Sequence, residues 1–197
     1  NKIRENCDNK IFKEIEKKIV SKNNSIFILG GRLPLFLSGK RFDNLEGGLE
    51  SEGDWHTFKS ANNKSIGENL KKSLIDMAEK GIKIIIIYPI PPMGWDIPKI
   101  LFHEYRESGI FSLKEKIINI DYQLFKDRAK ESFEILDTIN HPNIYKIFPH
   151  EIVCNTVLEN RCVGNDTDYI YYEDDDHPSY YYSREILKII VKILNKF

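Results

Sequence analysis

Ile82-Lys83-Ile84-Ile85-Ile86-Ile87-Tyr88 is a nearly continuous apolar run near the middle of the chain. Apolar residues on both faces are typical of a central strand in a parallel sheet that helices cover on both sides. The run ends at Pro89, because proline lacks the N–H group that a sheet ladder needs. We therefore predict a parallel sheet with residues 82–88 among its central strands.

Helix and strand patterns alternate on either side of this run. The segment before it, residues 65–80, begins with a Ser-x-x-Glu capping box at Ser65 and Glu68 and stops at Gly81, which predicts a helix. Apolar spacing predicts further helices at residues 8–22, 112–138 and 179–195, and further strands at residues 25–29 and 144–148. This alternation favours one α/β domain over residues 1–197 with a doubly covered parallel sheet.

Three of the segments outside these elements carry clear loop signals. Residues 33–44 are broken by proline and glycine, and residues 45–63 form a long polar loop that could serve as a lid or a substrate-binding insert. Residues 89–98 are rich in proline and cannot be regular structure. In parallel α/β folds, chemistry gathers beyond the carboxyl ends of the strands. We therefore predict that Gly30-Gly31-Arg32, the 89–98 loop and the segment leading to His177 meet at one rim of the sheet.

The segment 172–179 carries Asp174 three residues before His177. On a tight turn this spacing lets the carboxylate reach Nδ1 of the imidazole and leaves Nε2 for a substrate or nucleophile, which is half of a hydrolase triad. Alternatively, the acids form a solvated loop that complements the dipole of the following helix. A third interpretation takes Asp174, Asp176 and His177 as cation ligands, although their spacing matches no calcium-loop motif.

Composition narrows the class of protein. The 197 residues include 29 Lys and Arg against 30 Asp and Glu, so the net charge is -1 and the signs are interspersed. Without a basic face, nucleic acid is not an expected partner. No apolar run approaches the roughly 18 residues of a membrane helix, and no signal peptide is recognisable. The chain starts at Asn1 and not at Met, so we expect a preceding segment in the whole protein.

Cysteine usage leaves two compartments open. Cys154 and Cys162 bracket a short polar segment that a disulfide could close in an oxidising compartment. Cys7 is then left over, either as a buried thiol or with a partner in a preceding segment. In a cytosolic protein, all three cysteines would be reduced.

Several blocks together carry a family resemblance: Ile28-Leu29-Gly30-Gly31-Arg32, Tyr88-Pro89-Ile90-Pro91-Pro92 with Gly94-Trp95-Asp96-Ile97-Pro98, the Cys154 and Cys162 pair, and Tyr-x-Asp-x-Asp-His-x-Ser at residues 172–179. In this combination the chain resembles the SGNH-hydrolase-like domain at the C-terminus of bacterial acyltransferase-3 membrane proteins. The resemblance covers nearly the whole chain, and the terminal block is its most specific part.

The resemblance implies a three-layer α/β/α sandwich with a parallel sheet whose first strand is absent from this chain. It implies transfer of acyl groups, usually acetyl, onto a cell-surface polysaccharide such as lipopolysaccharide O-antigen. The acyl donor would be delivered by an acyltransferase-3 membrane domain that tethers this domain to the extracytoplasmic, periplasmic side of the bacterial inner membrane. We expect no cofactor and no metal.

The same resemblance implies roles for single residues. His177 would take the proton of a nucleophilic Ser, and Asp174 would hold the imidazole in the right tautomer. Backbone N–H groups of Gly30 or Gly31 would contribute to the oxyanion hole. Arg32 would add positive charge there or contact an acidic acceptor; alternatively, it forms a salt bridge to the acidic loop. Cys154 and Cys162 would be disulfide-bonded.

One block of the family is missing, namely the Gly-Asp-Ser-His sequence that supplies the nucleophile. Ser38 lacks the strand-to-helix setting of such a nucleophile, so we interpret it as an ordinary loop residue. We expect the Ser in a preceding segment, and we expect the chain by itself to be nearly inert. The alternatives are a polysaccharide-binding domain that has lost the Ser and a secreted carbohydrate esterase.

Overall fold

A computed structural model describes residues 9–21, 25–52, 65–110 and 112–197. Cys7 and part of the long loop, residues 53–63, lie outside the described residues. The chain forms two compact units. The described residues of the first unit are 9–21, 25–39, 65–88 and 131–147, and those of the second are 40–52, 89–110, 112–130 and 148–197. That residues 1–197 form one domain stays a prediction.

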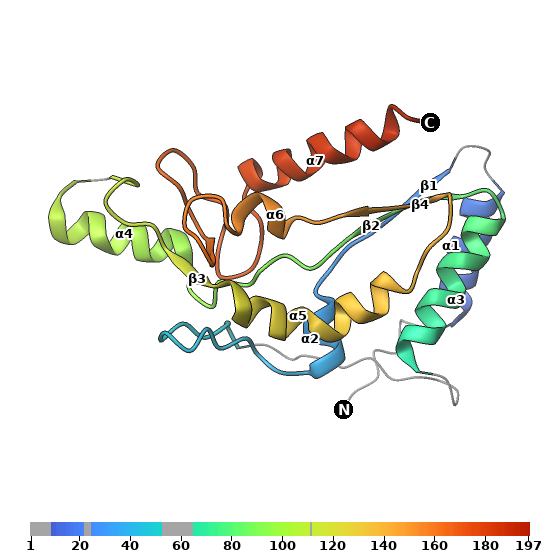
Figure 1. Ribbon diagram of the computed structural model, residues 1–197, viewed down its shortest axis with the longest axis horizontal. Coiled ribbons are helices and arrows are strands. Elements are labelled where there is room, and N and C mark those ends of the chain that lie inside the picture. The colour runs from blue at the N-terminus through green and yellow to red at the C-terminus, as the bar shows by residue number, and fades with distance from the viewer. Residues whose placement is uncertain (1–8, 22–24, 53–64, 111) are drawn as a thin grey trace. The chain divides into compact units, whose positions relative to one another are not determined.

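The first unit contains the parallel sheet. Its strands β1 (Ile26–Leu29), β2 (Lys83–Ile87) and β4 (Ile144–Ile147) lie side by side in the order β1-β2-β4, and both pairings are parallel (Figure 1). The β2 residues Ile84, Ile85 and Ile86 are fully buried. The α/β class and the central place of the isoleucine-rich strand are therefore confirmed.

Three helices belong entirely to the first unit: α1 (Asn9–Val20), α2 (Leu33–Ser38) and α3 (Ile66–Glu79). Helix α3 begins with the predicted capping box, in which the Ser65 side chain accepts the Glu68 N–H and the Glu68 side chain accepts the Ser65 N–H. Pro34 and Gly39 break the sequence pattern here, so the sequence predicts no regular element over residues 33–44. Pro34 instead stands in the first turn and Gly39 caps the last, with φ at 64°, so both residues delimit a short helix.

The predicted helix over residues 112–138 is wrong in its first part. Helix α5 runs only from Tyr122 to Asp137, and Asn119–Asp121 form strand β3, which pairs antiparallel with β5 (Arg161–Val163). The backbone N–H of Ile118 donates to Oδ1 of Asn165 and its carbonyl accepts the Gly164 N–H. These long-range bonds outweigh the local helical spacing, because helix propensity is a weak preference.

The remaining elements of the second unit are α4 (Ile97–Ser108), α6 (His150–Val153) and α7 (Tyr180–Leu194). Of these helices, the sequence predicts only α7. Helix α4 begins at Ile97, so the prediction that residues 89–98 are irregular is wrong for Ile97 and Pro98, because proline is compatible with the first turn of a helix. Asp96 caps α4 by accepting the Lys99 N–H, and Gly109 ends it at φ 71°. Cys154, at the end of α6, is disulfide-bonded to Cys162 in β5, with the sulfurs 2.00 Å apart.

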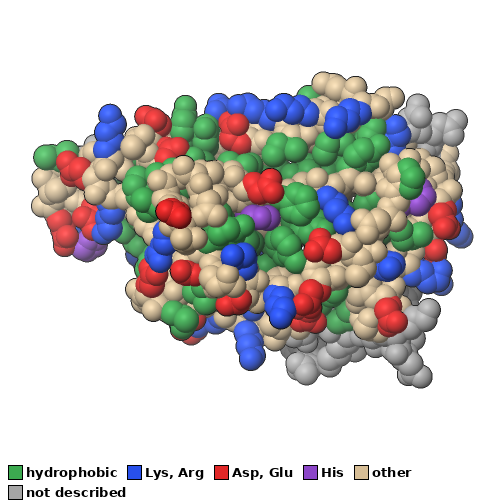
Figure 2. Space-filling model, in the orientation of Figure 1, with side chains coloured by type: hydrophobic (Ala, Val, Ile, Leu, Met, Phe, Trp, Pro, Cys, Tyr) green, Lys and Arg blue, Asp and Glu red, His purple; other side chains and the backbone are tan. Residues whose placement is uncertain are grey.

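On the face drawn in Figure 2, both acidic and basic side chains are exposed. Among the residues that the structure describes, every helix is too short or too polar to cross a membrane.

Candidate active site

The segment from Tyr171 to Ser179 folds back on itself as a tight turn. Tyr172 and Pro178 pair as an isolated antiparallel bridge, and the Glu173 N–H donates to the His177 carbonyl at 2.9 Å. Ser179 then caps α7 by accepting the Tyr182 N–H. The turn brings Asp174 and His177 together over three residues, as their spacing predicts.

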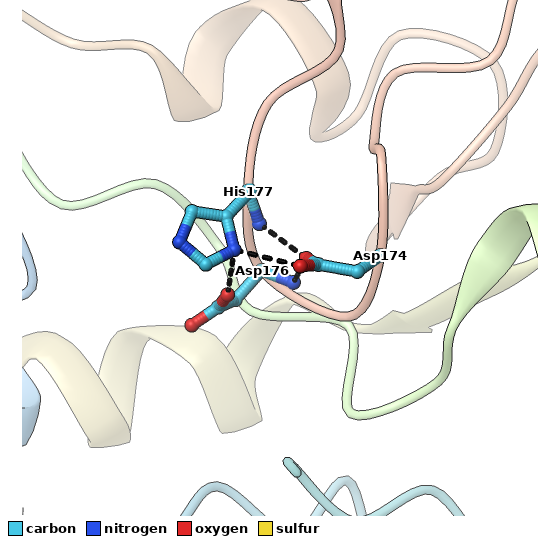
Figure 3. Close-up of side chains that lie close together, drawn as sticks. All are labelled: Asp174, Asp176 and His177. Carbon is cyan, nitrogen blue, oxygen red and sulfur yellow. Dashed lines mark hydrogen bonds and ion pairs between the residues drawn. The ribbon is translucent and has the colours of Figure 1, made fainter. Parts of the chain in front are cut away.

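The Asp174 carboxylate is fixed from two directions. Its Oδ1 accepts the backbone N–H groups of Asp176 at 2.9 Å and of His177 at 2.8 Å, and its Oδ2 lies 2.7 Å from Nδ1 of His177 (Figure 3). Burial raises the pKa of Asp174, but these N–H groups and the imidazole lower it by more, so the net pKa lies below the ordinary value. The carboxylate is thus an anion at neutral pH and the natural acceptor for an Nδ1 proton.

A second carboxylate, which the sequence analysis did not assign to the histidine, contacts the same nitrogen. Oδ1 of Asp176 lies 2.9 Å from Nδ1 of His177. Only 8% of the Asp176 side chain is exposed, against 38% for Asp174 and 62% for His177. In Figure 3 both carboxylates lie at one edge of the ring, and Nε2 at the opposite edge points away from them. The imidazole is therefore oriented with Nδ1 toward both acids and Nε2 directed away from them.

The same three side chains have the geometry of a possible cation site. Their ligand atoms all lie within 4.8 Å of one another. The separations of 2.7 and 2.9 Å between Nδ1 and the two carboxylates are hydrogen-bond distances, however, and a ligating Nδ1 would direct its lone pair at the ion instead. We interpret the cluster as a hydrogen-bonded His–Asp arrangement.

The proline-rich loop lies against this turn, as predicted. The Met93 N–H donates to the Asp175 carbonyl at 2.7 Å, the Ile97 N–H donates to the Asp174 carbonyl at 3.2 Å, and the Tyr172 hydroxyl donates to the Pro91 carbonyl at 2.8 Å. Tyr172 is 1% exposed. Two of the three loops predicted to converge are therefore joined by buried hydrogen bonds.

Gly30, Gly31 and Arg32 belong to the first unit, and their meeting with His177 stays a prediction. They follow β1 directly, and Arg32 is the N-cap residue of α2. Gly31 has φ of 148°, a conformation that favours glycine. Ser38 is the last residue of α2 and not a loop residue, and its hydroxyl donates to the Pro34 carbonyl at 2.8 Å.

The site is also supported by Asn44, which directly precedes the predicted loop of residues 45–63 and for which the sequence predicts no role. Asn44 is 1% exposed; its Nδ2 donates to the Met93 carbonyl at 2.9 Å, and its Oδ1 accepts the N–H groups of Glu46 and Gly48. An Asn shortly before a Gly-Gly pair is a turn signal, which indicates local structure but not its distant partner.

A family model described as SGNH domain (fused to AT3 domains) matches residues 1–192. The chain belongs to this SGNH domain family. No curated protein and no solved structure matches the chain. Membership of a family that is fused to AT3 domains indicates a hydrolase- or acyltransferase-type activity for this SGNH domain.

Proposed function

We propose that this chain is the catalytic domain of an O-acyltransferase that moves acyl groups, usually acetyl, onto a cell-surface polysaccharide such as lipopolysaccharide O-antigen. The observation that carries the proposal is the Asp174–His177 pair. Nδ1 of His177 lies 2.7 Å from Oδ2 of Asp174, and Nε2 of the same ring points away from the carboxylates. The family's fusion to AT3 domains favours acyl transfer over simple hydrolysis.

In the proposed mechanism, Nε2 of His177 takes the proton of a Ser hydroxyl while the Ser oxygen attacks the carbonyl carbon of the acyl donor. The bond from this carbon to the leaving group breaks, and the imidazolium returns its proton to the leaving group. An acyl ester on the Ser remains. A sugar hydroxyl then attacks this ester with the same help from His177, and the Ser recovers its proton.

Asp174 keeps the proton of the neutral ring on Nδ1 and stabilises the imidazolium that forms in each step. Asp176, at 2.9 Å from the same nitrogen, adds negative charge beside that cation. We propose that the N–H groups of Gly30 or Gly31, with Arg32, stabilise the oxyanion, and that the Ser is supplied by a segment preceding residue 1 in the whole protein.

The proposed location is the extracytoplasmic side of the bacterial inner membrane, where an acyltransferase-3 membrane domain tethers this domain and delivers the acyl donor. The Cys154–Cys162 disulfide supports an oxidising compartment, because such bonds are rare in the cytosol. The polysaccharide is the proposed acceptor, and nucleic acid has no part in the proposal.

The test is to incubate the whole purified protein with a chromogenic acetyl ester, with and without polysaccharide. The masses of the protein and of the polysaccharide are then measured by mass spectrometry. We expect a mass gain of one acetyl group on the protein and, with polysaccharide, on the sugar. Hydrolysis of the ester without transfer would indicate a carbohydrate esterase. Binding of polysaccharide with neither reaction would indicate a sugar-binding domain.

A further inference from the structure

In the sequence, Asp175 lies between Asp174 and Asp176, the two acids that contact His177. The Asp175 side chain instead contacts Ser51. Asp175 is 6% exposed. Its Oδ2 accepts the backbone N–H of Ser51 at 2.8 Å, and its Oδ1 accepts the Ser51 hydroxyl at 3.2 Å. A buried carboxylate is stabilised only where hydrogen bonds replace its water, and Ser51 provides two of them from a segment 124 residues away.

These contacts close a ring of three chain segments. The Asn44 side chain donates to the Met93 carbonyl, the Met93 N–H donates to the Asp175 carbonyl, and the Asp175 carboxylate accepts both bonds from Ser51. Asn44 and Ser51 belong to one chain segment, residues 40–52, so the ring of contacts returns to its start. The turn that bears His177 is thereby tied at its middle residue through the main chain and the side chain.

The loop also packs closely against the Met93 segment. A Cβ built on Gly48 would lie 2.7 Å from Nε1 of Trp95, and a Cβ built on Gly94, which has φ of 70°, would lie 3.0 Å from the Gly48 carbonyl oxygen. Approaches this short exclude a side chain at either position without a shift of the backbone or the indole. The ring of hydrogen bonds is therefore supported by steric contact.

We infer that Asp175, anchored by Ser51, is a positioning residue for the reaction proposed above: it fixes the backbone of the turn so that Asp174 and Asp176 both reach Nδ1 of His177. The inference rests on the proposed function. Its physical basis is that Asp175 is covalently joined to both acids, so any rotation of its backbone moves their carboxylates away from the ring.

The direct test reads the tautomer of His177 in the 197-residue chain by long-range ¹H–¹⁵N correlation at a pH where the ring is neutral. In the wild type we expect the proton on Nδ1, because two carboxylates accept from it. Asp175→Ala should shift the population toward the Nε2–H form. Ser51→Ala, which keeps the backbone N–H bond, should shift it less, and it provides a milder variant if Asp175→Ala folds poorly.

Two further variants separate positioning from general stability. Asp175→Asn keeps the shape and can still accept the Ser51 N–H, so it should restore most of the Nδ1–H form. Phe125→Leu, in the buried core of the same unit, should lower the unfolding midpoint without changing the tautomer. A tautomer that is unchanged in Asp175→Ala and Ser51→Ala, or changed equally by Phe125→Leu, would overturn the inference.

In the whole protein, Asp175→Ala should lower kcat for acyl transfer on the order of tenfold to 100-fold and leave KM for the acyl donor nearly unchanged. The reason is that a misoriented His177 imidazole impairs the chemical step and not the binding of the donor. A rise in KM with kcat unchanged would contradict this role. Because the tautomer is measured without substrate, it decides whether Asp175 positions His177 even if the proposed acyl transfer proves wrong.

Discussion

Oδ1 of Asp176 lies 2.9 Å from Nδ1 of His177, on the ring edge that Asp174 also contacts. A triad with one acid depends on that acid alone for the orientation of its imidazole. Here two acids of different burial share the task. Their contributions can therefore be separated by substituting one at a time.

Asp174→Asn should reduce acyl transfer by at least about 100-fold, since an amide at this place can present a donor to Nδ1 and favour the wrong tautomer. Asp176→Asn should reduce it less, because Asp174 also accepts two backbone N–H groups and keeps the turn in shape. The measurement is kcat of the whole protein for both variants and the double variant. Equal losses in the two single variants would contradict this ranking.

His150 makes the stability of the second unit sensitive to pH. It is 7% exposed among the rings of Tyr122, Phe125 and Phe148, and burial lowers its pKa from 6.5 to about 4. Well above pH 6.5 the His150 ring is neutral in both the folded and the unfolded state, so the lowered pKa does not affect stability. Between pH 6.5 and 4 only the unfolded state binds the proton, so stability falls, by up to about 3 kcal/mol below pH 4.

The check is the free energy of urea unfolding for the wild type and for His150→Phe at pH 7.5, 6 and 5. Phenylalanine fills a similar volume and binds no proton, so the difference between the two proteins should change steadily in favour of the variant as the pH falls. A difference that is constant over this range would show that His150 is protonated in the folded state as readily as in the unfolded state.

Gly48→Ala should destabilise the second unit by about 1 to 3 kcal/mol, because its Cβ would lie 2.7 Å from the Trp95 indole and closer still to the Asn44 amide. The matched control is Gly30→Ala, whose Cβ would lie at an ordinary 3.4 Å from Cβ of Ile87 and should cost less than about 1 kcal/mol. Thermal unfolding of both variants measures the contrast. Similar midpoints would refute the close packing at Gly48.

Loss of the Cys154–Cys162 bond should lower stability by roughly 2 to 3 kcal/mol, the value expected for a loop this short. The comparison is the unfolding free energy of the wild type and of the Cys154→Ser, Cys162→Ser double variant. Mass spectrometry of the unreduced, unfolded protein gives an independent check. Alkylation of both cysteines without a reducing agent would mean that the bond does not form.

Local signals in the sequence predicted the elements that depend on neighbouring residues. The isoleucines of β2 predicted a buried parallel strand, the Ser65 and Glu68 pair predicted the start of α3, and the spacing of Asp174 and His177 predicted their contact. In each case the residues that carry the signal lie within one turn or one strand, although the strands that pair with β2 are distant in the sequence. The structure added only their distances and burial.

Long-range contacts could not be predicted in this way. Residues 112–118 have helical spacing, but Ile118 is held by Asn165, and β3 by β5, from 40 or more residues away. The bond of Asp175 to Ser51 spans 124 residues, and nothing near either residue indicates the other. The supporting ring of the site therefore became visible only in the folded chain.

The most direct test of the proposed function is the acyl content of surface polysaccharide from cells that carry the whole protein with His177→Ala. His103→Ala is the matched control, since His103 is an exposed histidine on α4 that pairs with Glu107. We predict that His177→Ala abolishes acylation while the folded protein is present in normal amounts, and that His103→Ala retains it. Wild-type acylation with His177→Ala would contradict the account and mean that this domain performs no chemistry.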